Sequence, residues 1–243
     1  LMDKIKLNQV NIKKFYDEIC NKYDYIFPLN EIQKKFMDNE IKGNRILDVG
    51  SSTGNLSKYL IENGINVTSI DINEKLIFKA AQKGVEVKKL NMLEIDTLNK
   101  FDTIINIGNT LPHLNNKKEI YTFLEKAYDR LEENGKLIIQ IINFNKFIIN
   151  RDKNNYLGSL PLIENENVKF ERNYYLDKNN NIIFKTILDD KIKNEEILLN
   201  INFEDLKNYL EKIGIKRLKY YGGFDKSFFD FENSVYLIIT GEK

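Results

Sequence analysis

The sequence predicts an α/β fold built on a doubly wound, mostly parallel sheet. The first observation is the segment 45–61, in which an apolar strand pattern stops at a cluster of small residues and a helical pattern starts at once. The second is the alternation of strand and helix patterns, which continues to about Asn143 and resumes with a helix at Phe203–Ile213. Such alternation is typical of a parallel sheet with helices on both faces. The last two strands of this core are expected near Lys216–Tyr221 and Ser234–Thr240.

The 243 residues are expected to form one domain with three parts. The core is assigned to residues 43–145 and 203–243. Residues 1–42 hold two helical patterns with Pro28 between them, which predict a helical cap in front of the core. Residues 146–202 are expected to be an insertion between two parts of the core.

The insertion contains three segments in which apolar and polar residues alternate, with turn-like breaks between them. This pattern predicts an antiparallel three-stranded sheet that projects over the carboxyl end of the core sheet and roofs a binding pocket. The alternative role for the insertion is an arm for dimerisation. The expected strands are Val168–Leu176, Ile182–Asp190 and Glu195–Ile201.

The turn after the first strand is the most informative part of the chain. Gly50 and Gly54 permit backbone angles and close approaches that a Cβ would block, so a ligand can rest against bare peptide at a helix start. Asp48 places a carboxylate at the end of the strand, beneath that ligand. The turn lacks the third glycine of a dinucleotide fingerprint and the Gly-Lys-Ser/Thr of a P-loop. A carboxylate without phosphate-binding chemistry suits a ligand end that carries an ammonium, and the alternative is an ordinary strand-to-helix turn.

A second carboxylate ends the next strand. Asp71 follows a β-branched apolar run and stands 23 positions after Asp48. An acid roughly 20 residues after a glycine turn is where a ribose diol finds its hydrogen-bond acceptor. Asp71 can accept from both hydroxyls, and Ile72 can cover one face of an adenine. The alternative for Asp71 is an N-cap of the helix from Asn73, but its register with Gly50 favours the ligand.

Two motifs resemble a known family. The run Asp48-x-Gly50-x-Ser52-x-Gly54 resembles motif I of the class I S-adenosylmethionine-dependent methyltransferases, D-x-G-x-G-x-G, with Ser52 in place of the middle glycine. The segment Phe101–Leu114 is similar to the L-G-N-S-x-x-H-L segment of the glycine N-methyltransferase-like subgroup. The resemblance implies a Rossmann-like seven-stranded sheet. It also implies S-adenosyl-L-methionine as cofactor and S-adenosyl-L-homocysteine as its product.

The resemblance assigns cofactor contacts along the strand ends. Asn91 and Met92, after the third strand, would contact the adenine, and Ile107, after the fourth, would lie against the methionine part. His113, the only histidine, would lie close to the sugar or the methionine end. The complete set of expected cofactor contacts is Asp48, Gly50, Ser52, Gly54, Asp71, Ile72, Asn91, Met92, Ile107 and His113.

For the methyl acceptor, the resemblance implies positioning roles for Asn109, His113 and, from the cap, Tyr23. Asn109 and Thr110 would form the rim of the acceptor site. Ile142 stands where the subgroup carries an arginine, and it cannot clamp a carboxylate as a guanidinium does, which puts glycine as acceptor in doubt. No residue is a convincing general base, and a neutral amine needs none.

Composition narrows the class of partners. Lys and Arg number 37 against 36 Asp and Glu, so there is no general attraction to nucleic-acid backbones. No apolar stretch approaches the roughly 20 residues that cross a bilayer. Cys20 is the only cysteine, which excludes an internal disulfide and favours a reducing compartment. We therefore expect a cytoplasmic enzyme, monomeric or homodimeric, that acts on a small molecule and binds no nucleic acid, membrane or metal.

The expected reaction is N- or O-methylation by direct in-line transfer. Two other functions fit parts of the pattern. A non-catalytic S-adenosylmethionine-binding or regulatory protein would keep the glycine turn and lack an acceptor pocket. A nicotinamide-dependent Rossmann enzyme would share the fold and Asp71, but it needs the third glycine that this turn lacks.

Overall fold

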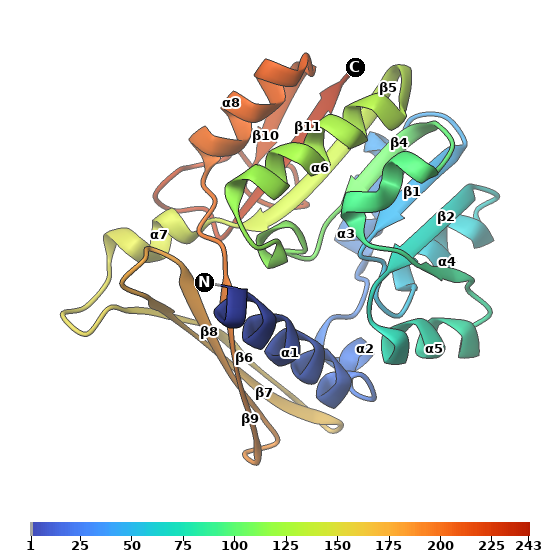
Figure 1. The fold of residues 1–243 in the computed structure, drawn as a ribbon. Helices are drawn as coiled ribbons and strands as arrows, with labels where there is room; N and C mark the ends of the chain where they lie inside the picture. The colour runs from blue at the N-terminus through green and yellow to red at the C-terminus, as the bar shows by residue number, and fades with distance from the viewer. Residues whose placement is uncertain (1) are drawn as a thin grey trace.

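The computed structural model describes residues 2–243 and contains a seven-stranded and a four-stranded sheet (Figure 1). The strands of the larger sheet lie in the order β10-β11-β5-β4-β1-β2-β3, and all but β11 run in the same direction. The predicted α/β class and seven-stranded core are confirmed. The strands are β1 Arg45–Val49, β2 Asn66–Asp71, β3 Val87–Lys89, β4 Phe101–Asn106, β5 Leu131–Ile142, β10 Lys216–Tyr221 and β11 Tyr236–Glu242.

Helices pack on both faces of this sheet (Figure 1). One apolar cluster joins the sheet to α6 and α8, and another joins its opposite face to α3 and α4. Asparagine side chains cap many of these helices, which gives the asparagine-rich sequence a local structural use. The connecting helices are α4 Asn55–Glu62, α5 Glu74–Gln82, η1 Met92–Thr97, η2 Leu111–His113, α6 Lys117–Arg130 and α8 Phe203–Ile213.

The cap consists of α1 Met2–Ile19, α2 Tyr23–Ile26 and α3 Glu31–Glu40. The two predicted helical patterns correspond to α1 and α3, and the short α2 lies between them. The cap was expected from residue 1, which lies outside the described residues. Figure 1 shows α1 running between the core and the smaller sheet, so that it faces both.

The smaller sheet is the insertion, and it has four strands where the sequence predicted three. The missed strand is β6, in which Gly158 and Pro161 interrupt the pattern and two register shifts against β7 blur the alternation. The last strand also begins three residues earlier than predicted, at Ile192. The strands are β6 Tyr156–Asn165, β7 Val168–Leu176, β8 Ile182–Leu188 and β9 Ile192–Leu198, and helix α7 Phe144–Ile149 precedes them.

Hydrogen bonds and apolar contacts hold the insertion against the cap. Asn8 of α1 donates from Nδ2 to the carbonyl of Ile197 (2.9 Å) and accepts from the amide of Ile197 (2.8 Å), which satisfies the edge strand β9. An apolar cluster that includes Phe15, Ile142 and Tyr174 joins α1, the end of β5 and the insertion sheet. The inner face of the insertion therefore lies over the carboxyl end of the core.

A buried ion cluster fixes the end of α3. The Glu40 side chain is 4% exposed and pairs with Lys136 of β5 and with Lys226, whose Nζ lies 2.6 Å away. Burial acts to raise the pKa of Glu40, but the two lysines outweigh it and hold the pKa below its usual range. The stabilisation is therefore complete at neutral pH and is lost as the pH falls through the lowered pKa.

We expect Glu40→Gln to lower the free energy of unfolding by about 3 kcal/mol at pH 7, because it leaves a buried lysine charge without its partner. Chemical denaturation measures the change. The control is Glu31→Gln at the exposed start of the same helix, which should change the free energy by less than about 0.5 kcal/mol. Equal effects of the two substitutions would contradict the importance of the buried cluster.

Candidate active site

A cavity of about 400 Å³ lies at the carboxyl edge of the larger sheet, with α1 along one side. Parallel α/β sheets bind ligands at this edge, and the volume lies within the range of small-molecule sites. Seven of the predicted contacts line the cavity, and the cap adds Gln9, Ile12, Lys13 and Tyr16. The seven are Gly50, Ser52, Asp71, Ile72, Asn91, Met92 and His113.

The glycine turn forms the floor of this cavity. Gly50, Ser52 and Gly54 all have left-handed backbones, with φ of 76°, 53° and 74°. Ser52 stands where the motif usually has a glycine, and it adopts the left-handed backbone that favours glycine. A Cβ at Gly50 would lie 2.6 Å from Cγ2 of Thr110, so only glycine fits there.

Gly54 is needed for a different reason. A Cβ at Gly54 would lie 3.0 Å from the side chain of Val85 and 3.3 Å from that of Ala80. Gly54 is buried against these residues and does not line the cavity. The structure therefore places it in helix packing, where the sequence had predicted a cofactor contact.

Asp71 joins the turn to the next strand. Its Oδ2 accepts from the amide of Ser52 (2.9 Å) and its Oδ1 from the amide of Asn73 (2.8 Å). Burial raises the pKa of Asp71, and these amides only partly oppose the rise. Each carboxylate oxygen keeps a further lone pair, and the residue lines the cavity, so it can accept from a ligand diol.

Asp48 lies behind the turn and outside the lining. Its carboxylate accepts from the hydroxyl of Ser57 on α4 (2.7 Å), which in turn accepts from the hydroxyl of Ser69 on β2 (2.7 Å). Burial raises the pKa of Asp48 from its usual 3.8 to about 6. The structure does not place this carboxylate against the cavity, so its influence on a bound cation would act across the turn.

The loop after β4 faces β5 through Asn109. The Oδ1 of Asn109 accepts from the amide of Ile142 (2.9 Å), and its backbone is left-handed with φ of 60°. Ile107 packs in the apolar cluster with α3 and α4. Neither residue lines the cavity, whereas Thr110 does. Asn109 therefore anchors the loop, and the structure gives it no direct place in the cofactor cavity.

The cap residue Tyr23 contacts the turn from outside the cavity. Its hydroxyl donates to Oγ of Ser52 (2.9 Å), and burial raises the pKa of Tyr23 to about 12. The neighbouring Asp24 accepts from Nδ2 of Asn55 (2.9 Å) and pairs with Lys83. Tyr23 therefore contacts the glycine turn directly, and Asp24 contacts Asn55 at the start of the helix that follows it.

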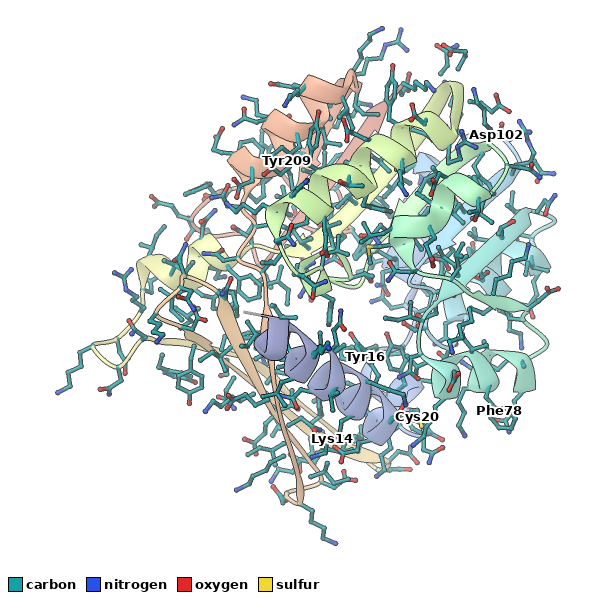
Figure 2. The ribbon with its side chains drawn as sticks, in the orientation of Figure 1. Lys14, Tyr16, Cys20, Phe78, Asp102 and Tyr209 are labelled. Atoms are coloured by element: carbon teal, nitrogen blue, oxygen red, sulfur yellow. The ribbon has the colours of Figure 1, made fainter. Side chains whose placement is uncertain are left out.

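His113 lies where three parts of the chain meet. Its Nδ1 is 3.1 Å from the carbonyl oxygen of Asn109, and because a carbonyl only accepts, this nitrogen carries the hydrogen. Its Nε2 is 3.2 Å from the hydroxyl of Tyr16 and 3.7 Å from a carboxylate oxygen of Glu196. Figure 2 shows Tyr16 on the side of α1 that faces the core.

Glu196 is the functional candidate that the sequence analysis missed. It lies on β9, is 1% exposed, and comes within reach of the cavity wall only because the insertion folds over the core. A signal was present: Glu196 shares the inward side of its strand with Leu198, and an acid among apolar positions of an alternating strand is unusual.

No cluster of metal-ligating side chains occurs within residues 2–243. No helix in that part of the chain is long and apolar enough to span a membrane. Among the residues that line the cavity, Asp71 brings a carboxylate, and Tyr16 and His113 bring a hydrogen-bonded pair.

The pKa of His113 tests this arrangement. Burial acts to lower it, but the attraction of the nearby Glu196 carboxylate and the carbonyls of Thr110 and Asn109 outweigh burial, so the pKa lies above the usual 6.5. NMR titration of the single histidine should give a pKa above 6.5, and Glu196→Gln should lower that pKa. Stability from the protonated His113 is present below pH 6.5 and is lost as the pH rises through the raised pKa. The control is Glu195→Gln on the outer face of β9, and an equal shift in both variants would contradict the contact.

The comparisons with known proteins agree with this geometry. A family model of the methyltransferase domain matches residues 46–135. A glycine/sarcosine N-methyltransferase of Halorhodospira halochloris is 29% identical over 149 residues, which are 54% of this chain and 54% of that protein. One from Aphanothece halophytica is 24% identical over 215 residues, which are 81% and 75% of the two proteins. The chain spans about half the length of the first curated relatives that it matches.

The solved structures extend the likeness over nearly the whole chain. The CcbJ methyltransferase from Streptomyces caelestis superposes with a TM-score of 0.76 at 17% identity, covering 92% of this chain and 95% of that one. Residues 46–135 therefore match the methyltransferase domain, and the chain has the fold of solved S-adenosylmethionine-dependent methyltransferases, as the resemblance of the glycine turn predicted.

Proposed function

We propose that this chain transfers a methyl group from S-adenosyl-L-methionine to a small-molecule acceptor. The observation that carries the proposal is the meeting, in one cavity of a methyltransferase domain, of a left-handed glycine turn and a strand-end carboxylate, Asp71. The near-neutral charge favours a small molecule over nucleic acid as acceptor. We expect a monomer or homodimer in the cytoplasm.

The lining fits the proposed cofactor part by part. Asp71 offers free lone pairs to a ribose diol. Ile72 and Met92 supply apolar surface beside it, and a thioether stacks favourably on an aromatic ring. The bare peptide at Gly50 allows close approach of the ligand chain. These contacts are proposals for the cofactor-binding residues of this site.

S-adenosylmethionine, when bound, would supply a methyl group on a sulfonium sulfur. A nucleophile about 3 Å from the methyl carbon would attack it in line with the carbon–sulfur bond and leave a neutral thioether. The protein's part is to align the acceptor and to exclude water. Helix α1 flanks the cavity with Ile12 and Tyr16, and the phenol of Tyr16 is held against Nε2 of His113. Burial raises the pKa of Tyr16 well above 10, so the phenol stays neutral. We assign Tyr16 and His113 to positioning of the acceptor.

At the end of β5, where the glycine N-methyltransferase-like subgroup carries an arginine, this chain has Ile142. Ile142 is 8% exposed and packs in the apolar cluster with Phe15 and Tyr174. Two relatives carry the name glycine/sarcosine N-methyltransferase, yet a carboxylated substrate at this position of the chain would meet apolar surface. We infer an N- or O-methyl acceptor other than glycine.

The first test is cofactor binding. Calorimetry should detect S-adenosylmethionine and S-adenosylhomocysteine, with no comparable binding of NADH. Asp71→Ala should weaken cofactor binding by about 1.5–3 kcal/mol, the range for a hydrogen bond to a charged group. Asp129→Ala on the exposed surface of α6 is the control and should bind normally. An unchanged dissociation constant in the Asp71 variant would remove the ribose assignment.

The second test is substrate choice. With the unmodified enzyme, glycine should be a poor methyl acceptor relative to bulkier amines and amines that carry no carboxylate in a side-by-side radiolabel assay. Ile142→Arg should lower stability by about 3 kcal/mol or more, because an unpaired charge would enter an apolar cluster. Efficient methylation of glycine by the unmodified enzyme would overturn the inference drawn from Ile142.

A further inference from the structure

The inner face of the insertion sheet carries buried polar atoms that lack hydrogen-bond partners. Within residues 2–243, both carboxylate oxygens of Glu196, Oγ1 of Thr186 and Nδ2 of Asn194 are in this state. Thr186 and Asn194 are opposite each other on β8 and β9, and Glu196 is opposite Phe184 on the same face. Buried polar groups without partners are rare and costly, so such a group on one face indicates a ligand or water site.

Within residues 2–243, His113 is the basic side chain that pairs with Glu196, and the pair carries opposite charges only when the imidazole is protonated. The Nε2 of His113 is 3.7 Å from its carboxylate, which is longer than a hydrogen bond. Arg172 lies on the same face opposite Thr186, and its Nε is a further buried atom without a partner, but its Nη2 donates to the carbonyl of Pro161 on β6, at the edge of the sheet opposite to β9. Lys185 pairs with Glu195 on the outer face.

The surroundings of Glu196 suit an organic cation. The rings of Tyr174 and Phe184 stack with centroids 5.0 Å apart, and Phe15 meets Phe184 edge-on at 5.7 Å. Aromatic side chains around a carboxylate exclude water and so strengthen its pairing with an organic cation. Tyr16 and His113 line the cofactor cavity, and His113 lies next to Glu196, so this carboxylate is directly behind the cavity wall.

We propose that this face is the acceptor subsite and that the acceptor is a cationic amine. Its ammonium pairs with Glu196 as an anchor and keeps its proton, so the methyl group goes to another nucleophilic atom of the acceptor, and its hydrogen-bonding substituents meet Thr186 and Asn194. The proposal rests on the proposed methyltransferase function and adds the charge of the substrate. It explains why a costly buried carboxylate is present without a partner. It also makes the insertion part of the site.

The test compares probes that differ only in charge. The full-length protein is titrated by calorimetry and NMR with benzylamine against benzyl alcohol and with ethanolamine against ethylene glycol, with and without saturating S-adenosylhomocysteine. Each amine should bind about tenfold or more tightly than its alcohol, in keeping with an added charged hydrogen bond. Glu196→Gln should abolish this preference. Glu195→Gln, one residue away on the outer face, should keep it.

Two further measurements separate the possible outcomes. S-adenosylhomocysteine affinity, measured first, should be the same in Glu196→Gln and in the unmodified protein; absence of cofactor binding would defeat the proposed function alone. At a pH above the raised pKa of His113, where the imidazole is neutral, the melting temperature of Glu196→Gln should exceed that of the unmodified protein, because an uncompensated charge is removed, whereas a structural role of Glu196 would give a decrease. Failure of every amine to bind, equal binding of alcohols, or a lowered melting temperature would overturn the acceptor subsite.

Discussion

The hydrogen bond from the amide of Ser52 to Asp71 is the contact on which the site depends. It ties the glycine turn of β1 to the end of β2, and so fixes the bare peptide and the carboxylate relative to each other. The parallel register of β1 and β2 brings the two strand ends to the same edge. The left-handed backbone of Ser52 is what aims its amide at Asp71. The nucleoside site that we propose depends on this single geometric constraint.

The cap and the insertion then convert an edge into an enclosed cavity. Tyr23 holds Ser52 from outside, and Asn8 joins α1 to the edge strand of the insertion at Ile197. Tyr16 on the same helix reaches His113. One helix is therefore fixed at the core, at the cavity and at the second sheet. Local opening of α1 would loosen all three connections together.

The sequence predicted the features that depend on local pattern. The helix Phe203–Ile213 and the strand Val168–Leu176 occur as predicted, because strong periodicity and an asparagine cap mark them. It missed β6, where Pro161 and register shifts hide the alternation. It also missed Glu196, because its role depends on a long-range contact across 83 positions with His113. The expected cofactor contacts of Asp48 and Gly54 were placed by motif, whereas in the structure the Asp48 carboxylate accepts from Ser57 and Gly54 is buried against Val85 and Ala80.

Electrostatics connects these parts. Asp48 and Asp71 are buried carboxylates with raised pKa values, and Glu196 is a third buried carboxylate. A protein gains no stability by collecting buried negative charge without cations, so the arrangement is costly in the free state. The ligands that the fold and the cavity imply bring that charge: a sulfonium with an amino group on one side and, by our inference, an ammonium on the other. Bound cationic ligands would therefore offset a free-energy cost that the buried carboxylates impose on the free protein.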